Sequence, residues 1–163
     1  MKKFELTNEF VTNMFGTKLF RIRALVEFGD VEAGELGGYV EKESNLGHDD
    51  NAWVYGDARV YDNALVYDNA RVYGDAQVSG DARVCGDARV CGNGDYAYAH
   101  GFGSVNRTTT FFRLKDGGVG VRCGCFYGTL AQFRDKIRET HGETKKAQEY
   151  LMLADLMKLR FEK

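Results

Sequence analysis

A six-residue repeat runs through the middle of the chain, from Ala52 to Asn93, and it limits what this sequence can fold into more than any other feature. Seven units follow one another without a slip: AWVYGD, ARVYDN, ALVYDN, ARVYGD, AQVSGD, ARVCGD and ARVCGN. Ala and Val stand two apart in every unit, so both side chains point to the same side of a short strand. The Gly, Asp and Asn residues that follow tolerate left-handed backbone angles and are typical of a corner.

One strand and one corner every six residues predict a prism with three walls and eighteen residues per coil. Residues eighteen apart should then stack about 4.8 Å apart along a wall. Solenoids with repeats of five or nine residues do not fit this period. A looser unit follows Asn93, in which Tyr96, His100 and Phe102 fall in the Ala and Val positions, and Leu46 occupies an Ala position one unit earlier. We therefore expect coils over residues 46–103.

The outward positions of the repeat stack into columns. The columns after Val contain Tyr55, Tyr73 and Cys91; Tyr61 and Ser79; and Tyr67 and Cys85. The columns between Ala and Val contain Trp53, Arg71 and Arg89; Arg59 and Gln77; and Leu65 and Arg83. Cys85 and Cys91 fall on different walls, so a disulfide between them is not expected.

The segments on either side of the repeat predict two caps, because the open ends of a solenoid expose strand edges that invite aggregation. Residues 1–45 should form a small N-terminal β cap, in which apolar and other residues alternate from Phe20 to Phe28 as in a half-buried strand. Residues 104–163 should form a C-terminal unit. There, 108–114 and 119–126 are typical of a hairpin around Lys115-Asp116-Gly117-Gly118.

Two helices complete the predicted C-terminal unit. Thr129 begins a capping box and Gly142 ends the first helix, and Thr144 caps a second helix that runs to Phe161. One face of the second helix carries Tyr150, Leu153, Ala154, Met157 and Phe161. We expect this face to close the second end of the solenoid; contact with a partner chain is the alternative. The fold class is mainly β, a parallel β-helix of about three coils with these caps.

The Ala and Val positions resemble the hexapeptide-repeat superfamily, whose unit has an aliphatic residue with a small residue two before it. That resemblance implies a left-handed β-helix, and a homotrimer as the expected assembly. The stretches LVEFGDVEAGELGGYV (25–40), EKESNL (41–46) and GCFYGTL (124–130) are similar to small proteins of phages and prophages. This similarity implies a phage origin and the cytoplasm of the infected bacterium as the location.

Enzymes of the same superfamily are acyltransferases that use a histidine base, so the three histidines are the candidates for that role. His48 lies before the repeat, His141 lies in a helix C-terminal turn, and His100 occupies an inward position of the degenerate last coil, where a partly buried structural role is expected. No loop interrupts the repeats to build an acceptor pocket. The sequence therefore predicts no catalytic residue and no cofactor, with an acyltransferase using His100 as the runner-up.

Metal binding is not expected either. Cys123-Gly124-Cys125 has no second ligand pair at a recognisable spacing, and as i and i+2 in a strand the two thiols should be small buried side chains on one face. The acidic corner columns, such as Asp57 over Asp75 over Asn93, are expected to be solvated. The chain lacks an apolar run of about 18 residues and a secretory signal, so no membrane partner is expected.

What remains is the surface of the solenoid. Its aromatic and arginine residues are of the types enriched in binding hot spots, and they give the candidate ligand or partner site: Trp53, Tyr55, Arg59, Tyr61, Tyr67, Arg71, Tyr73, Arg83 and Arg89. Subunit packing is the competing interpretation of the same residues. The net charge of −2 gives no general attraction to duplex nucleic acid.

The functional hypothesis is a non-catalytic oligomeric binder of phage origin that sequesters or blocks a host component. Its partner would be a host protein or a small anionic, nucleotide-like ligand, and the role would be to oppose host defence. The alternatives are the acyltransferase and a structural or assembly protein.

Overall fold

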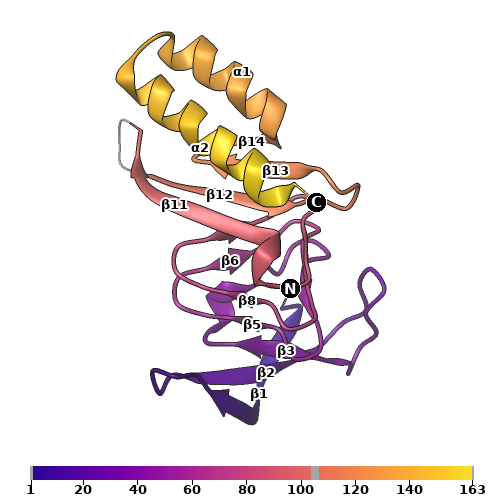
Figure 1. The fold of residues 1–163 in the computed structure, drawn as a ribbon. Coiled ribbons are helices and arrows are strands. Elements are labelled where there is room, and N and C mark those ends of the chain that lie inside the picture. The colour runs from indigo at the N-terminus through magenta and orange to yellow at the C-terminus, as the bar shows by residue number, and fades with distance from the viewer. Residues whose placement is uncertain (1, 104–106, 163) are drawn as a thin grey trace.

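The computed structural model describes residues 2–103 and 107–162, and places an N-terminal sheet and a C-terminal unit at opposite ends of a stack of short strands (Figure 1). The N-terminal elements are β1 (Phe4–Thr12), β2 (Lys18–Ala24), β3 (Leu36–Val40) and the 3-10 turn η1 (Glu43–Asn45). The repeat supplies β4 (Trp53–Val54), β5 (Arg59–Val60), β6 (Leu65–Val66), β7 (Arg71–Val72), β8 (Gln77–Val78), β9 (Arg83–Val84) and β10 (Arg89–Val90). The C-terminal elements are η2 (Asn93–Asp95), β11 (Tyr96–Phe102), β12 (Arg107–Arg113), β13 (Val119–Cys123), β14 (Phe126–Thr129), α1 (Leu130–His141) and α2 (Lys145–Phe161).

The repeat strands stack in parallel, and each pairs with the strand three units away. β4, β7 and β10 form one wall, in which Trp53 lies opposite Arg71 and Arg71 opposite Arg89. β5 pairs with β8, and β6 pairs with β9, in the same register. This offset confirms the predicted coil of eighteen residues. The Ala and Val of all seven units are at most 1% exposed, so they form the core that the repeat predicted.

The corners of the coils also follow the prediction. The fifth residue of the first six units has a positive φ, between 57° and 66°; these residues are Gly56, Asp62, Asp68, Gly74, Gly80 and Gly86. The two aspartates at this position also hold the next coil. The Asp62 and Asp68 carboxylates each accept a hydrogen bond of 3.1 Å from a backbone N–H one coil later, that of Gly80 and of Gly86.

The N-terminal sheet continues one wall of the solenoid and covers the first coil. β1, β2 and β3 pair antiparallel, and β3 then lies parallel to β5, so the strand order is β1-β2-β3-β5-β8. Phe4 and Phe28 pack their rings against Trp53 at centroid distances of 6.3 and 5.2 Å. Trp53 keeps its predicted column, in register with Arg71, but it is 0% exposed because the N-terminal unit covers it, so it is not a surface residue as predicted.

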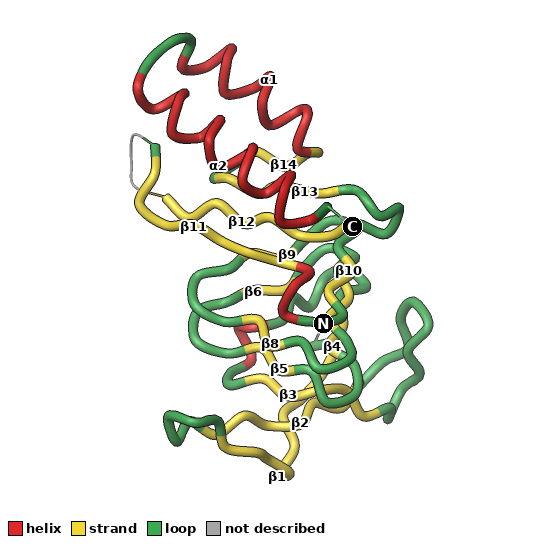
Figure 2. Tube along the Cα trace, viewed as in Figure 1, coloured by secondary structure: helices red, strands yellow, loops and turns green. Residues whose placement is uncertain are grey.

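The C-terminal unit is a four-stranded antiparallel sheet of order β11-β12-β13-β14, with α1 and α2 on the face that points away from the solenoid (Figures 1 and 2). The structure confirms the hairpin of β12 and β13 and both helix caps, Thr129 and Thr144. Two expectations fail. Tyr96–Phe102 is not a last coil, because this seven-residue strand pairs antiparallel along β12, whereas a coil wall holds strands of two residues. The end of the solenoid is covered by the sheet, and α2 packs behind it.

Side chains of the C-terminal sheet alternate between two cores. Tyr96 and Phe112 face the solenoid and join its core, whereas Phe111 and Val121 face the helices. The helix side includes Phe133, Tyr150, Ala154, Met157 and Phe161, so the predicted apolar face of α2 is buried against the sheet and α1. Within residues 2–103 and 107–162, no helix is both long and apolar enough to cross a membrane.

Candidate binding surfaces

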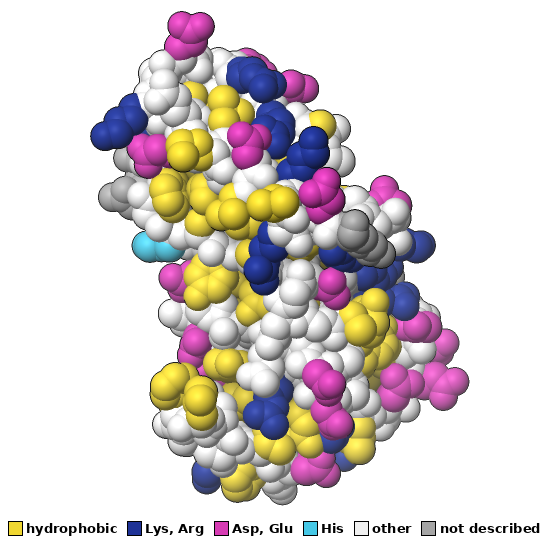
Figure 3. Space-filling view, viewed as in Figure 1, with side chains coloured by type: hydrophobic (Ala, Val, Ile, Leu, Met, Phe, Trp, Pro, Cys, Tyr) yellow, Lys and Arg dark blue, Asp and Glu magenta, His cyan; other side chains and the backbone are white. Residues whose placement is uncertain are grey.

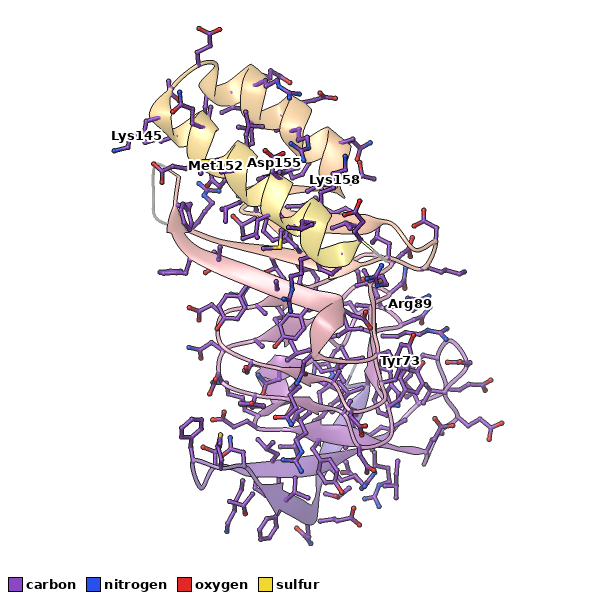
Figure 4. The ribbon with its side chains drawn as sticks, in the orientation of Figure 1. Tyr73, Arg89, Lys145, Met152, Asp155 and Lys158 are labelled. Carbon is purple, nitrogen blue, oxygen red and sulfur yellow. The ribbon has the colours of Figure 1, made fainter. Side chains whose placement is uncertain are left out.

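Four of the predicted surface residues meet on the wall formed by β4, β7 and β10. Tyr55, Arg71, Tyr73 and Arg89 line a shallow cavity of about 330 Å³, which we call the tyrosine–arginine groove. Their side chains come from adjacent coils, because the repeat places the same outward positions above one another every eighteen residues. Figure 4 shows Tyr73 and Arg89 on the same side of the solenoid, with Arg89 nearer the C-terminal sheet.

Asp30, from the N-terminal unit, orders one half of this groove. Its carboxylate accepts a hydrogen bond of 3.0 Å from the Tyr55 hydroxyl and one of 3.2 Å from Arg71 Nη1. The Arg71 guanidinium also lies 5.9 Å from the centre of the Tyr55 ring. Burial, together with the hydrogen bond to Asp30, raises the pKa of Tyr55 to about 12, so the folded groove disfavours the phenolate.

Arg89 gives the other half of the groove a positive charge. Its Nη1 donates to the carbonyl oxygens of Asn69 at 3.1 Å and Ala88 at 2.9 Å. Among the described residues, no Asp or Glu lies within ion-pairing distance of Arg89, whereas Arg71 is paired with Asp30. The groove therefore combines two tyrosine side chains, one neutralised arginine and one arginine held in place by neutral oxygens.

The other predicted residues lie elsewhere. Tyr61 is on the wall of β5 and β8, where its hydroxyl donates to Gln77 Oε1 at 3.3 Å, and Arg59 lies on the same wall. Tyr67 and Arg83 belong to the wall of β6 and β9. The nine candidates are therefore divided among three walls and do not form one surface, and Trp53 is in the core.

A second polar cavity lies where the C-terminal sheet meets the wall of β6 and β9. This junction pocket has a volume of about 340 Å³. Its lining residues are Tyr67, Asp81, Arg83, His100, Arg107, Thr108, Arg122 and Gly124. Sequence reasoning missed Arg107 and Arg122. The alternation of Val119, Val121 and Cys123 with Gly120 and Arg122 is a signal for the outward facing of Arg122, but only the docking of the sheet brings Arg122 to the solenoid.

His100 is exposed at the rim of the junction pocket, and the inward position predicted for it was wrong. Its Nδ1 lies 2.8 Å from Thr108 Oγ1 on the neighbouring strand β12. The change follows from the antiparallel pairing of β11, which turns His100 toward the solenoid wall rather than into a coil. The His48 ring, by contrast, stacks on the Phe4 ring at a centroid distance of 4.4 Å, and its Nε2 lies 3.1 Å from Glu43 Oε1.

The two cysteines of the Cys123-Gly124-Cys125 motif do not share a buried strand face. Cys123 pairs with Phe126 across a tight turn, so Gly124 and Cys125 form the loop between β13 and β14, with φ 59° at Gly124. Cys125 is exposed and Cys123 is partly buried beside Tyr150, whose pKa is raised by burial and by this thiol. Both line a cavity of about 240 Å³ between the sheet and the helices. All four cysteines are free thiols.

Comparison with known proteins supports the repeat and nothing beyond it. The family described as the YdcK β-solenoid repeat matches residues 58–74, 64–80 and 76–92. These three overlapping segments span the last six of the seven repeat units, up to residue 92, and do not reach the N- and C-terminal units. No curated protein matches the chain. The chain thus contains a β-solenoid repeat similar to that of the YdcK family, and the N- and C-terminal units on either side lie outside the matched residues.

Proposed function

We propose that this protein is a non-catalytic binding protein and that the tyrosine–arginine groove takes a planar, anionic ligand of the nucleotide class. The observation that carries the proposal is the groove itself: Tyr55, Tyr73, Arg71 and Arg89 converge on one cavity, and Arg89 has no carboxylate partner among the described residues. A guanidinium binds a phosphate through charge-assisted hydrogen bonds, and tyrosine rings offer a flat apolar surface to a base.

The size and rigidity of the groove fit such a ligand. Its volume of about 330 Å³ lies at the small end of the range for ligand sites. The backbone under it is held by the stacked strands, since Tyr55 and Tyr73 donate their backbone N–H groups to Val72 and Val90 in the next coil. A rigid site loses little conformational freedom when a ligand binds, which favours affinity.

The wider proposal adds origin, assembly and role. The similarity of residues 25–46 and 124–130 to phage proteins supports a host component as the target, in the cytoplasm of the infected bacterium. The hexapeptide pattern supports a left-handed turn of the coils and a homotrimer, in which the groove would lie near a neighbouring subunit. Sedimentation velocity of the purified chain tests the assembly, and a mass of one subunit contradicts it.

The binding test is isothermal titration calorimetry with a panel of purine and pyrimidine mononucleotides and cyclic dinucleotides, each compared with its nucleoside. We expect at least one nucleotide to bind, and its nucleoside to bind about tenfold more weakly, because a charged hydrogen bond is lost. Arg89→Gln should weaken the binding of the nucleotide to a similar extent. The matched control is Arg160→Gln, an exposed arginine on α2. Failure of the whole panel, or equal affinity for Arg89→Gln and the parent chain, rejects the groove as a nucleotide site.

One observation favours a second candidate, the hexapeptide acyltransferase. His100 is exposed beside a cavity that three arginines line, an arrangement in which a histidine could meet a phosphate-bearing substrate. Coenzyme A binding, and an acyl-transfer activity that His100→Ala abolishes while coenzyme A still binds, would replace the binder proposal with this one.

A further inference from the structure

The C-terminal sheet overhangs one wall of the solenoid and forms the roof of the junction pocket. Side chains of the sheet that point to the solenoid include Tyr96 and Phe112, which reach its core. Thr110 points the same way, and its Oγ1 accepts a hydrogen bond of 2.9 Å from the backbone N–H of Arg83 in β9. Toward the edge, His100 and Arg122 project over the wall of β6 and β9. Two units of the fold therefore build this pocket together.

Several arginines line the junction pocket without ion pairs to carboxylates of the described residues. Arg83, Arg107 and Arg122 line it, and among the described residues none of the three lies within ion-pairing distance of a carboxylate. The acidic residue that shares the lining is Asp81. The chain as a whole has 24 acidic and 22 basic residues, so unpaired arginines are not forced by its composition. Three guanidinium groups that converge on one cavity repel one another unless an anion lies between them.

The arginine side chains are also positioned by neutral groups. Arg83 Nη1 donates to the carbonyl oxygen of Asn63 at 3.2 Å. The Arg122 guanidinium lies 5.8 Å from the centre of the Tyr67 ring, where it can stack on the aromatic face. Arginines that are oriented by a ring and a carbonyl keep further N–H donors for a ligand, because each guanidinium has five. His100 adds a ring nitrogen near the same space.

From this arrangement we propose that the junction pocket is a binding site for a phosphate or diphosphate group, separate from the tyrosine–arginine groove. The chemistry is bidentate recognition of a tetrahedral oxyanion by Arg83, Arg107 and Arg122. The cavity of about 340 Å³ accommodates such a group with room for an attached moiety at its open side. The two sites lie on different walls, so either one can be tested while the other is intact.

The test uses the full chain in a phosphate-free chloride buffer, with inorganic pyrophosphate as the probe, by isothermal titration calorimetry. We expect one pyrophosphate per chain, with affinity that falls as salt is added. Arg122→Gln and Arg83→Gln should each weaken binding about tenfold or more, because each removes charged hydrogen bonds. Arg160→Gln, the exposed control on α2, should bind as the parent chain does. Circular dichroism and Trp53 fluorescence check that each variant is folded.

Three results overturn the proposal. The first is no binding of pyrophosphate by the parent chain. The second is binding that Arg122→Gln and Arg83→Gln leave unchanged. The third is binding that Arg89→Gln abolishes and Arg122→Gln does not, which would place the anion in the tyrosine–arginine groove. Adenosine diphosphate as a second probe separates the sources of the phosphate: tighter binding than pyrophosphate, still sensitive to Arg122→Gln, indicates a nucleotide, and equal binding indicates a free anion.

Discussion

Single residues carry much of the stability of the first coil, and Trp53 is the clearest case. It is the largest fully buried side chain, and Phe4 and Phe28 cover it. Its indole Nε1 is buried without a hydrogen-bond partner among the described residues. The contribution of this residue to stability should therefore come from packing rather than from its N–H group.

Replacing Trp53 tests this interpretation. Trp53→Ala should lower the free energy of unfolding by about 3–5 kcal/mol, because it leaves a large cavity. Trp53→Phe keeps a ring and loses no hydrogen bond, so it should cost clearly less. The measurement is urea unfolding followed by circular dichroism. Equal losses for the two variants would contradict ring packing as the main contribution of this residue.

Cys85 offers a prediction that depends on pH. Burial is the main reason that its pKa is raised to about 11, and the Tyr67 hydroxyl and Arg122 oppose this shift. The folded state therefore disfavours the thiolate. The stabilising contribution of the neutral thiol is complete below about pH 9 and is lost as the pH rises toward about 11.

The pH effect is isolated by comparing the parent chain with Cys85→Ala. The difference in unfolding free energy between the two should be constant at neutral pH and should shift in favour of Cys85→Ala at alkaline pH. Denaturant unfolding at a series of pH values measures it. Cys91→Ala, which removes an exposed thiol, serves as the control for the loss of a cysteine. A flat difference for Cys85→Ala would mean that its thiol titrates normally.

At the scale of the elements, the corners determine how well the coils stack. Gly56 and Gly86 occupy the same position of the repeat, with φ 58° and 60°. A Cβ at Gly56 meets no heavy atom within 4 Å, whereas one at Gly86 would overlap the Tyr127 hydroxyl, which reaches the corner from β14. The two glycines therefore separate backbone strain from crowding.

We expect Gly56→Ala to cost about 1–2 kcal/mol, the penalty of a left-handed conformation for a residue with a side chain. Gly86→Ala should cost more, because it also displaces Tyr127, which accepts a hydrogen bond from the backbone N–H of Asp87 at 3.3 Å. Thermal and urea unfolding of the two variants provide the comparison. A larger loss for Gly56→Ala would contradict the docking of Tyr127 on this corner.

Asp68 shows how an acidic residue serves at a corner. It has φ 57°, and its carboxylate accepts from the N–H of Gly86 one coil away. Asp68→Ala should lower stability by about 1–3 kcal/mol, through the lost bond and the left-handed strain. Asp68→Asn keeps an acceptor and a residue type that tolerates this conformation, so it should be close to neutral. If Asp68→Asn lost more stability than Asp68→Ala in urea unfolding, the hydrogen bond between the coils would be excluded as the cause of the loss.

At the scale of the whole molecule, the chain has two cores on either side of one sheet. The first runs from Phe4 through the coils to Phe112, and the second joins the outer face of the C-terminal sheet to α1 and α2. The exposed face of α2 carries Met152, Leu156 and Leu159, and apolar side chains gather over this part of the surface (Figure 3). Separate cores can open separately.

Phe133→Ala should reveal this division. Phe133 is 1% exposed and packs against Phe111, Phe126 and Tyr150 at centroid distances of 5.7 to 6.0 Å. Its loss should let the helices unfold at lower denaturant than the coils. The loss of the helical circular dichroism signal should then occur at a lower denaturant concentration than the change in the fluorescence of Trp53, because Trp53 lies in the first core. Coincident transitions would show that the two cores unfold as one unit.

The extent of prediction from sequence differs between the coils and the sites. The six-residue period predicts the three walls and the vertical register of the coils. It also predicts that Tyr55 stacks under Tyr73 and Arg71 under Arg89 on one wall, because residues eighteen apart are vertical neighbours. The junction pocket could not be predicted, since Arg107 and Arg122 meet Arg83 only after a separate sheet docks on the wall.

The sequence by itself determined the solenoid: short polar corners and paired Ala and Val residues leave few other ways to bury the core. The tertiary structure decided what happens at its two ends. There, Trp53 is covered by the N-terminal unit, Tyr96–Phe102 leaves the coils for an antiparallel partner, and the sheet takes the closing position expected for α2. The physical reason is that a coil repeats local contacts, whereas an end is closed by whichever distant segment buries the most apolar surface and pairs the most strand edge.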